Sequence, residues 1–104
     1  MAKYVFVPAY YEWHFIDEEN PDKVLLNMQD PIDSLCKGED NDELMDDIDD
    51  VYDVCEDYIN NTRMNLELEG IAIDYNGNSL DKLDELPADA ADIMAKSLYE
   101  YYIA

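Results

Sequence analysis

Residues 39–57 read EDNDELMDDIDDVYDVCED, and this stretch decides the fold class of the 104-residue chain. Eleven of its nineteen positions are Asp or Glu, yet an apolar residue returns every three or four positions. The stripe is formed by Leu44, Ile48, Val51, Cys55 and Tyr58, and Met45, Tyr52 and Ile59 widen it. A disordered acidic segment would not keep such a stripe. The pattern predicts an amphipathic helix from Asn41 to Asn61, about 30 Å long, whose exposed face is carboxylate.

The first 29 residues are typical of β-structure. Tyr, Val, Phe, Trp and Ile dominate Lys3–Val7 and Tyr10–Ile16, which we expect to be strands. Pro8–Ala9 between them predicts a bend, a bulge or a short hairpin connection. A polar turn follows at Asp17–Asp22, and Lys23–Gln29 fits either a third strand or a helical turn.

Two further short helices and a final helix have start and stop signals. Asp30–Pro31 predicts the start of a short helix that stops at Gly38. Ser79 is placed to cap another one, which would run through Glu85. After Pro87, the segment Ala88–Tyr102 predicts a last helix. Its expected buried face consists of Ala91, Met94, Ala95, Leu98 and Tyr102.

The segment Met64–Tyr75 alternates like a strand, but its phase changes in the middle. Met64, Leu66 and Leu68 share one parity. The other parity is shared by Ile71, Ile73 and Tyr75. The switch at Gly70 predicts a β-bulge or a tight reversal, and Asn76–Gly77 predicts a turn. Together these elements predict a single small α+β domain. We expect a small, mostly antiparallel sheet packed by the long acidic amphipathic helix and the C-terminal helix.

The charge balance limits the partners. The chain has 27 acidic and 6 basic residues, a net charge of −21. Phosphate backbones and anionic membranes need basic surfaces, so neither is expected to bind directly, and the natural partner is a basic protein surface. Two cysteines are too few for a disulfide scaffold. With neither a signal peptide nor a membrane span in the sequence, we expect a cytoplasmic protein.

Catalytic and metal sites are poorly supported. His14 is the only histidine, it lies between Trp13 and Phe15, and no nucleophile motif is present, so we expect neither an enzyme nor a cofactor. Residues 74–85 have oxygen ligands at loop positions 1, 3, 5 and 12 of a calcium loop. Ser79 replaces the glycine of position 6, and Asp81 stands where an apolar residue belongs. Calcium binding is therefore the weaker alternative.

The acidic helix offers a different chemistry. Asp46, Asp49, Asp50 and Asp53 follow helical spacing, about 5–6 Å apart on one face, which is the scale of a phosphate backbone. A solvated face kept for solubility is the alternative, although ordinary surface helices mix charge signs. Nine tyrosines add candidate interface residues, and Tyr99 and Tyr101 are expected to be the exposed ones at the carboxyl end.

The small size, the charge of −21, the tyrosine content and the helical acids resemble the small acidic DNA-mimic proteins of bacteriophages and mobile elements. That class includes anti-restriction proteins, anti-CRISPR proteins and inhibitors of uracil-DNA glycosylase, and no sequence motif defines it. The resemblance implies a non-enzymatic inhibitor that occupies the DNA- or RNA-binding cleft of a basic protein, such as a bacterial defence nuclease or a CRISPR effector. If the chain is phage-encoded, this would take place in the host cytoplasm.

The expected partner-binding residues are the acids of the helical region and two acids after it. They are Glu39, Asp40, Asp42, Glu43, Asp46, Asp47, Asp49, Asp50, Asp53, Glu56, Asp57, Glu67 and Glu69. We expect four further acids to extend this surface: Asp74, Asp81, Asp84 and Glu85. The main alternative is an acidic module that blocks a basic partner without copying DNA. A two-fold homodimer through the tyrosine-rich ends would lengthen the acidic strip.

Overall fold

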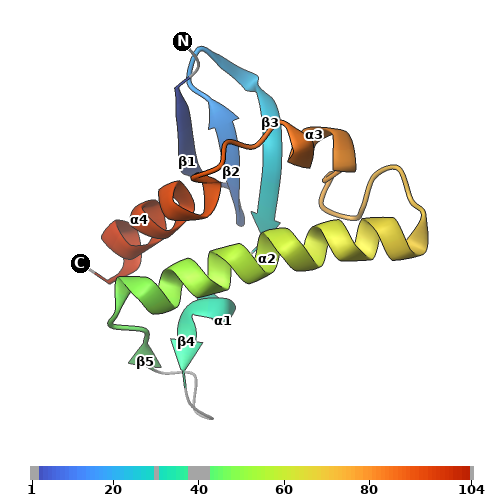
Figure 1. Cartoon of the computed structure of the whole chain (residues 1–104). Helices are drawn as coiled ribbons and strands as arrows, with labels where there is room; N and C mark the ends of the chain where they lie inside the picture. Colours follow the sequence, from blue (N-terminus) through green and yellow to red (C-terminus); the bar gives the residue numbers. More distant parts are fainter. Residues whose placement is uncertain (1–2, 30, 38–42, 104) are drawn as a thin grey trace.

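The structure is a computed structural model that describes residues 3–29, 31–37 and 43–103. Its elements are β1 (Tyr4–Ala9), β2 (Glu12–Asp17), β3 (Asn20–Gln29), α1 (Ile32–Leu35), β4 (Cys36–Lys37), β5 (Glu43–Leu44), α2 (Ile48–Glu69), α3 (Leu80–Asp84) and α4 (Ala90–Tyr102). The first three strands form an antiparallel sheet in the order β1-β2-β3, and β4 pairs with β5. Figure 1 shows the long α2 crossing below the sheet, with α4 beside its first turns. The predicted α+β architecture is confirmed.

The register of the sheet builds one side of the core. Phe6 pairs with Phe15, and Phe15 pairs with Leu26, so three buried side chains line up across the strands. The next pair, Ile16 with Val24, skips Leu25. This β-bulge lets two consecutive leucines of β3 both be buried, which strict alternation would forbid. The segment that fitted either a strand or a helical turn is therefore a strand.

The helices supply the other side of the core. Val51, Cys55 and Leu66 of α2 join Met94 and Leu98 of α4 in the same buried cluster as the strand residues. The predicted buried face of the final helix is confirmed, except that Tyr102 is only half-buried. That helix begins at Ala90, two residues later than expected.

The short connections follow their sequence signals with one shift. Ser79 caps α3 as predicted, because its Oγ accepts a hydrogen bond from the backbone N of Lys82 at 3.3 Å. The bend expected at Pro8–Ala9 lies two residues later, at Tyr10–Tyr11, because both earlier residues still pair with β2. The short helix after Pro31 is present as α1, but it ends at Leu35 and does not continue to Gly38, because Cys36–Lys37 pair with β5 as strand β4. Asp30 and Gly38 themselves lie outside the described residues.

The acidic helix begins later than predicted. Its first residue is Ile48, and Asp47 is the N-cap, whose carboxylate accepts a hydrogen bond from the backbone N of Asp49 at 2.9 Å. The expected start at Asn41 lies outside the described residues, and Leu44 belongs to β5. The physical reason is the cap itself, since an aspartate in extended conformation satisfies the first free amides of a helix.

The predicted strand over Met64–Tyr75 is wrong. Residues 64–69 continue α2, where Leu66 is buried one helical turn after the buried Thr62. Leu68, with the same parity as Leu66, is 78% exposed, so the alternation is not a sheet face. Gly70 is neither a bulge nor a reversal of a strand. It ends the helix with a left-handed φ of 63°, and its backbone N donates to Leu66 O at 3.0 Å.

Candidate functional site

The first three turns of α2 carry a group of carboxylates that we call the acidic row. It consists of Asp49, Asp50, Asp53, Glu56 and Asp57, and all five residues are exposed. Val51 and Cys55, on the opposite side of the helix, are fully buried. Because successive residues turn by about 100° around a helix, anchoring these apolar residues directs the acidic row into solvent.

No residue of the acidic row forms an ion pair within the described part of the chain. The described ion pairs of lysine and arginine lie elsewhere: Arg63 with Asp84 at 2.8 Å, Lys23 with Glu85 at 2.6 Å, Lys96 with Asp92 at 3.2 Å and Lys3 with Glu18 at 3.3 Å. The row has a neutral partner: the hydroxyl of Tyr52 forms a hydrogen bond with Glu56. This bond raises the pKa of Tyr52. The row is therefore not paired with any lysine or arginine whose side chain the structure describes.

The other expected partner-binding residues are scattered. Asp46 and Asp47 precede α2, so the expected row of four carboxylates from Asp46 onwards does not lie wholly on the helix. Glu67 and Glu69 are exposed at its far end. Glu43 lies in β5, and three more acids lie outside the described residues: Glu39, Asp40 and Asp42.

The four acids expected to extend the surface differ in their exposure and in whether their carboxylates already have partners. Asp84 and Glu85 are engaged by Arg63 and Lys23. Asp74 is half-buried, and its Oδ1 accepts hydrogen bonds from the backbone N of Asn76 and Asn78, both at 2.9 Å. Of the four, only Asp81 is an exposed acid with no ion pair among the described residues.

The segment compared with a calcium loop has a different local geometry. The turn at Asn76–Gly77 is held by the Asp74 carboxylate, and residues 80–84 form α3. Among the described residues there is no group of three or more His, Cys, Asp or Glu side chains that could hold a metal ion. The geometry gives no support to the calcium alternative.

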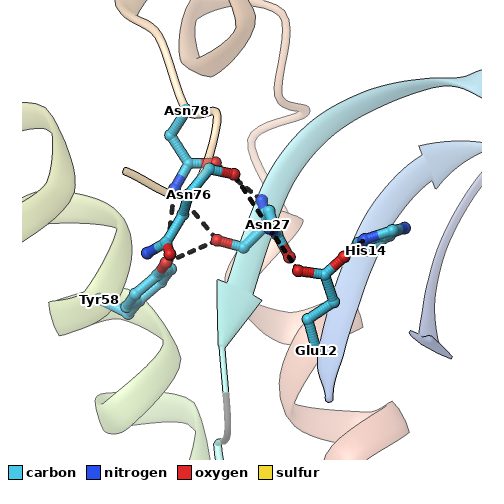
Figure 2. A network of polar contacts seen from close by, with 6 residues as sticks. All are labelled: Glu12, His14, Asn27, Tyr58, Asn76 and Asn78. Carbon is cyan, nitrogen blue, oxygen red and sulfur yellow. Dashed lines mark hydrogen bonds and ion pairs between the residues drawn. The ribbon is translucent and has the colours of Figure 1, made fainter. Parts of the chain in front are cut away.

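A polar network connects the sheet with α2 and with the 74–78 turn (Figure 2). Asn27 is its centre. Its backbone N donates to Asn78 Oδ1 at 2.7 Å, and its carbonyl accepts from Asn78 Nδ2 at 3.0 Å and from the Tyr58 hydroxyl at 2.6 Å. The side-chain amide of Asn78 thus forms the two hydrogen bonds with the edge of β3 that the backbone of one residue in a fourth strand would form.

His14 belongs to the other end of this network. Its Nε2 lies 2.8 Å from Glu12 Oε1, and Asn27 Nδ2 donates to Glu12 Oε2 at 2.9 Å. The hydrogen bonds from Asn27 and from His14 lower the pKa of Glu12. Both carboxylate oxygens of Glu12 and Nε2 of His14 thus have partners within the sheet.

Exposed apolar side chains gather at the far end of α2 and in the loop after it. They are Met64, Leu68, Ile71, Ile73 and Tyr75, and we call them the apolar end. Figure 1 shows this end of α2 and the following loop lying beyond the sheet. This feature was not predicted from the sequence, because the alternation of apolar residues over 64–75 predicted a strand. Gly70 was the available signal, since glycine is the common C-terminal stop of a helix.

The cysteines and the helices show no other candidate chemistry. Both cysteines are free thiols, and burial raises the pKa of Cys55 to about 12, so its thiol is protonated at neutral pH. None of the helices in the described residues is long and apolar enough to cross a lipid bilayer.

Comparisons of the chain with protein-family models, with curated proteins and with solved structures found no match.

Proposed function

We propose that the chain is a non-enzymatic inhibitor whose acidic row imitates the phosphates of a nucleic acid and occupies the nucleic-acid-binding cleft of a basic protein. A bacterial defence nuclease or a CRISPR effector is the kind of target that this chemistry fits. Binding would exclude DNA or RNA by competition. Lysine and arginine of the target would pair with the row, and the release of counter-ions would make the affinity fall with salt.

The linear density of charge supports this proposal most strongly. From Asp49 to Asp57 the helix rises by about 12 Å, so five carboxylates give about one charge per 3 Å of axis. One strand of duplex DNA carries one phosphate per about 3.4 Å of axis. A cleft built to bind one strand would meet a similar density of negative charge on α2.

The row also destabilises its own helix, and a helix that needed only to be soluble could do without this destabilisation. Asp53 lies three or four residues from each of the other four members, so it takes part in four like-charge pairs: with Asp49, Asp50, Glu56 and Asp57. Each such pair destabilises a helix by about 0.2–0.5 kcal/mol, or roughly 1–2 kcal/mol for the four. A soluble helix could avoid this cost by mixing charge signs, which favours a role for the uncompensated row in binding.

A competition experiment with matched variants tests the proposal. The immobilised protein is loaded with bacterial lysate at low salt, and a 30-base-pair DNA duplex is then added. The row variant combines Asp50→Asn, Asp53→Asn, Asp57→Asn and Glu56→Gln. The control variant combines Asp22→Asn, Asp89→Asn, Glu19→Gln and Glu100→Gln, which are exposed acids outside the row and outside the expected partner-binding surface, and it has the same net charge.

We expect the wild-type and control proteins to retain nucleic-acid-binding proteins that the duplex releases, and the row variant to lose them. Retention by the row variant at the wild-type level would refute a role for the row. Retained proteins that the duplex does not displace would refute mimicry.

The second candidate function is an acidic module that blocks a basic partner without copying DNA. The apolar end favours this second function. A nucleic acid has no exposed apolar groups that correspond to Leu68 or Ile73. Exposed apolar clusters mark protein interfaces. In that case the duplex would not compete. The double variant Leu68→Ser and Ile73→Ser would abolish retention, whereas the row variant would only weaken it.

A further inference from the structure

A cleft lined by aromatic rings lies between the tip of the β1–β2 hairpin and the carboxyl end of α4. Its volume is about 440 Å³, within the range of small-ligand sites. The residues that matter here are Pro8, Tyr11, Glu12, Trp13, Tyr101 and Tyr102. They come from segments almost 90 residues apart in the chain, so only the fold brings them together.

The rings meet at steep angles. Trp13 and Tyr101 are nearly perpendicular, at 88°, with centroids 5.1 Å apart, and Tyr101 and Tyr102 are at 74° and 4.8 Å. Trp13 Nε1 donates to the Tyr102 hydroxyl at 3.3 Å, which fixes the indole. Trp13 is only 4% exposed, whereas Tyr101 is 62% exposed. The cleft therefore has a rigid aromatic floor and an accessible aromatic wall.

The hairpin tip holds a strained residue at this cleft. Tyr11 has a positive φ of 64°, the only such value among the non-glycine residues described, and it is 78% exposed. A tyrosine in the left-handed region costs about 1–2 kcal/mol, and turns normally place Gly, Asn or Asp there. Strained residues of this kind cluster at binding sites.

Charge decides what such a cleft would accept. Glu12 is the only charged residue among the described residues that line it, and the whole chain has a net charge of −21. The electron-rich faces of aromatic rings attract cations, and arginine is the commonest partner. An anionic ligand such as a nucleotide would be repelled by the same field.

We propose that this cleft binds an arginine side chain of a basic polypeptide. The guanidinium group would lie against the exposed face of Tyr101, within the negative field of the chain. This site is separate from the acidic row and goes beyond the proposed mimicry, since it would recognise one side chain rather than a line of positive charge.

Trp13 is the only tryptophan, so its fluorescence reports on the cleft. The probe is the blocked peptide acetyl-Gly-Arg-Gly-amide, and its control is the same peptide with citrulline, which keeps the shape and removes the charge. We expect a saturable change in fluorescence with the arginine peptide and none with citrulline. Equal binding of both peptides, or no saturable change, would overturn the proposal.

Variants then locate the site. Tyr101→Leu keeps apolar volume but removes the ring, and we expect it to weaken binding about two- to fivefold, while Tyr101→Phe should bind like wild type. Tyr75→Ala, a fully exposed tyrosine of the apolar end, is the matched control.

The row variant should still bind the peptide, which separates this inference from the proposed function: either can fail alone. Unchanged affinity in Tyr101→Leu, or loss of binding in the row variant, would refute the assignment of the cleft.

Discussion

Replacement of Asn78 by alanine should lower the free energy of unfolding by about 3 kcal/mol. Asn78 is only 1% exposed, and its amide group makes two good hydrogen bonds to the backbone of Asn27 and a longer one, 3.4 Å, to the Tyr58 hydroxyl. Each bond contributes about 0.5–1.5 kcal/mol, and the loss of a partner for the Asn27 N–H adds about 1 kcal/mol or more. The 74–78 turn itself should persist, because its hydrogen bonds to Asp74 use backbone groups of Asn76 and Asn78.

Urea unfolding followed by circular dichroism measures this loss. With an m-value of about 1.5 kcal/mol/M, a loss of 3 kcal/mol moves the midpoint by about 2 M. Asn65→Ala is the matched control, because Asn65 is exposed on α2 and makes no hydrogen bond through its side chain in the described residues, so it should change stability by less than about 0.5 kcal/mol. Tyr58→Phe should cost about 1 kcal/mol.

Hydrogen exchange supplies an independent measure. The amide of Asn27 should exchange much faster in Asn78→Ala than in the wild type, while the amide of Phe15, in the centre of the sheet, should change only with global stability. A stability loss below about 1 kcal/mol, or unchanged protection at Asn27, would refute the conclusion that Asn78 closes the edge of β3.

Three other perturbations have defined outcomes. Asp53→Asn removes all four like-charge pairs of the acidic row, so it should raise the melting temperature by a few degrees at low salt and by little at 1 M salt. An equal gain at both would contradict the repulsion argument, and Asp22→Asn is the control. Gly70→Ala should cost about 1 kcal/mol in urea unfolding because its φ of 63° is left-handed, and a neutral result would contradict that reason. Cys55 should resist iodoacetamide at pH 8 until the protein is unfolded. Its folded pKa, about 12, lies above the ordinary value of 9.0, so the stability that it contributes is complete below pH 9 and falls from there towards pH 12. Cys55→Ala should lack that part of the decline.

The sequence predicted elements well where a local pattern corresponds to a local cause. The spacing of Val51 and Cys55 on the acidic helix and of Met94 and Leu98 on the last helix follows directly from burial of one helical face. The cap at Ser79 also depends on neighbouring residues alone. These are the features that a single chain segment determines.

Residues 64–69 were wrongly predicted as a strand, because their local pattern does not correspond to a local cause. Met64, Leu66 and Leu68 alternate, but only Leu66 is buried, because α2 continues past the end of the sheet and leaves its last turns largely in solvent. Alternation alone cannot show that two of three apolar residues are exposed. The helix preference of Met, Leu and Glu, together with Gly70, was the better guide.

The candidate site was predicted in part. The acids of α2 could be found because carboxylates at helical spacing are visible in sequence. The engagement of Asp84 and Glu85 by Arg63 and Lys23 depends on contacts 21 and 62 residues apart, which no local pattern encodes. The cleft at Trp13 and the contact of Asn78 with Asn27 were missed for the same reason.

The bond from the Tyr58 hydroxyl to the Asn27 carbonyl has a consequence for the direction in which α2 faces. Tyr58 directly follows Asp57, so this bond and the buried Cys55 fix how the helix is rolled about its axis at the turns that carry the carboxylates. A roll by one residue would swing those carboxylates by about 100°. Packing against the sheet therefore fixes the direction in which the charged side of α2 faces. A peptide of residues 48–69 would present the same groups without a fixed direction and without lasting helical structure, because its like charges repel and nothing packs against its apolar side.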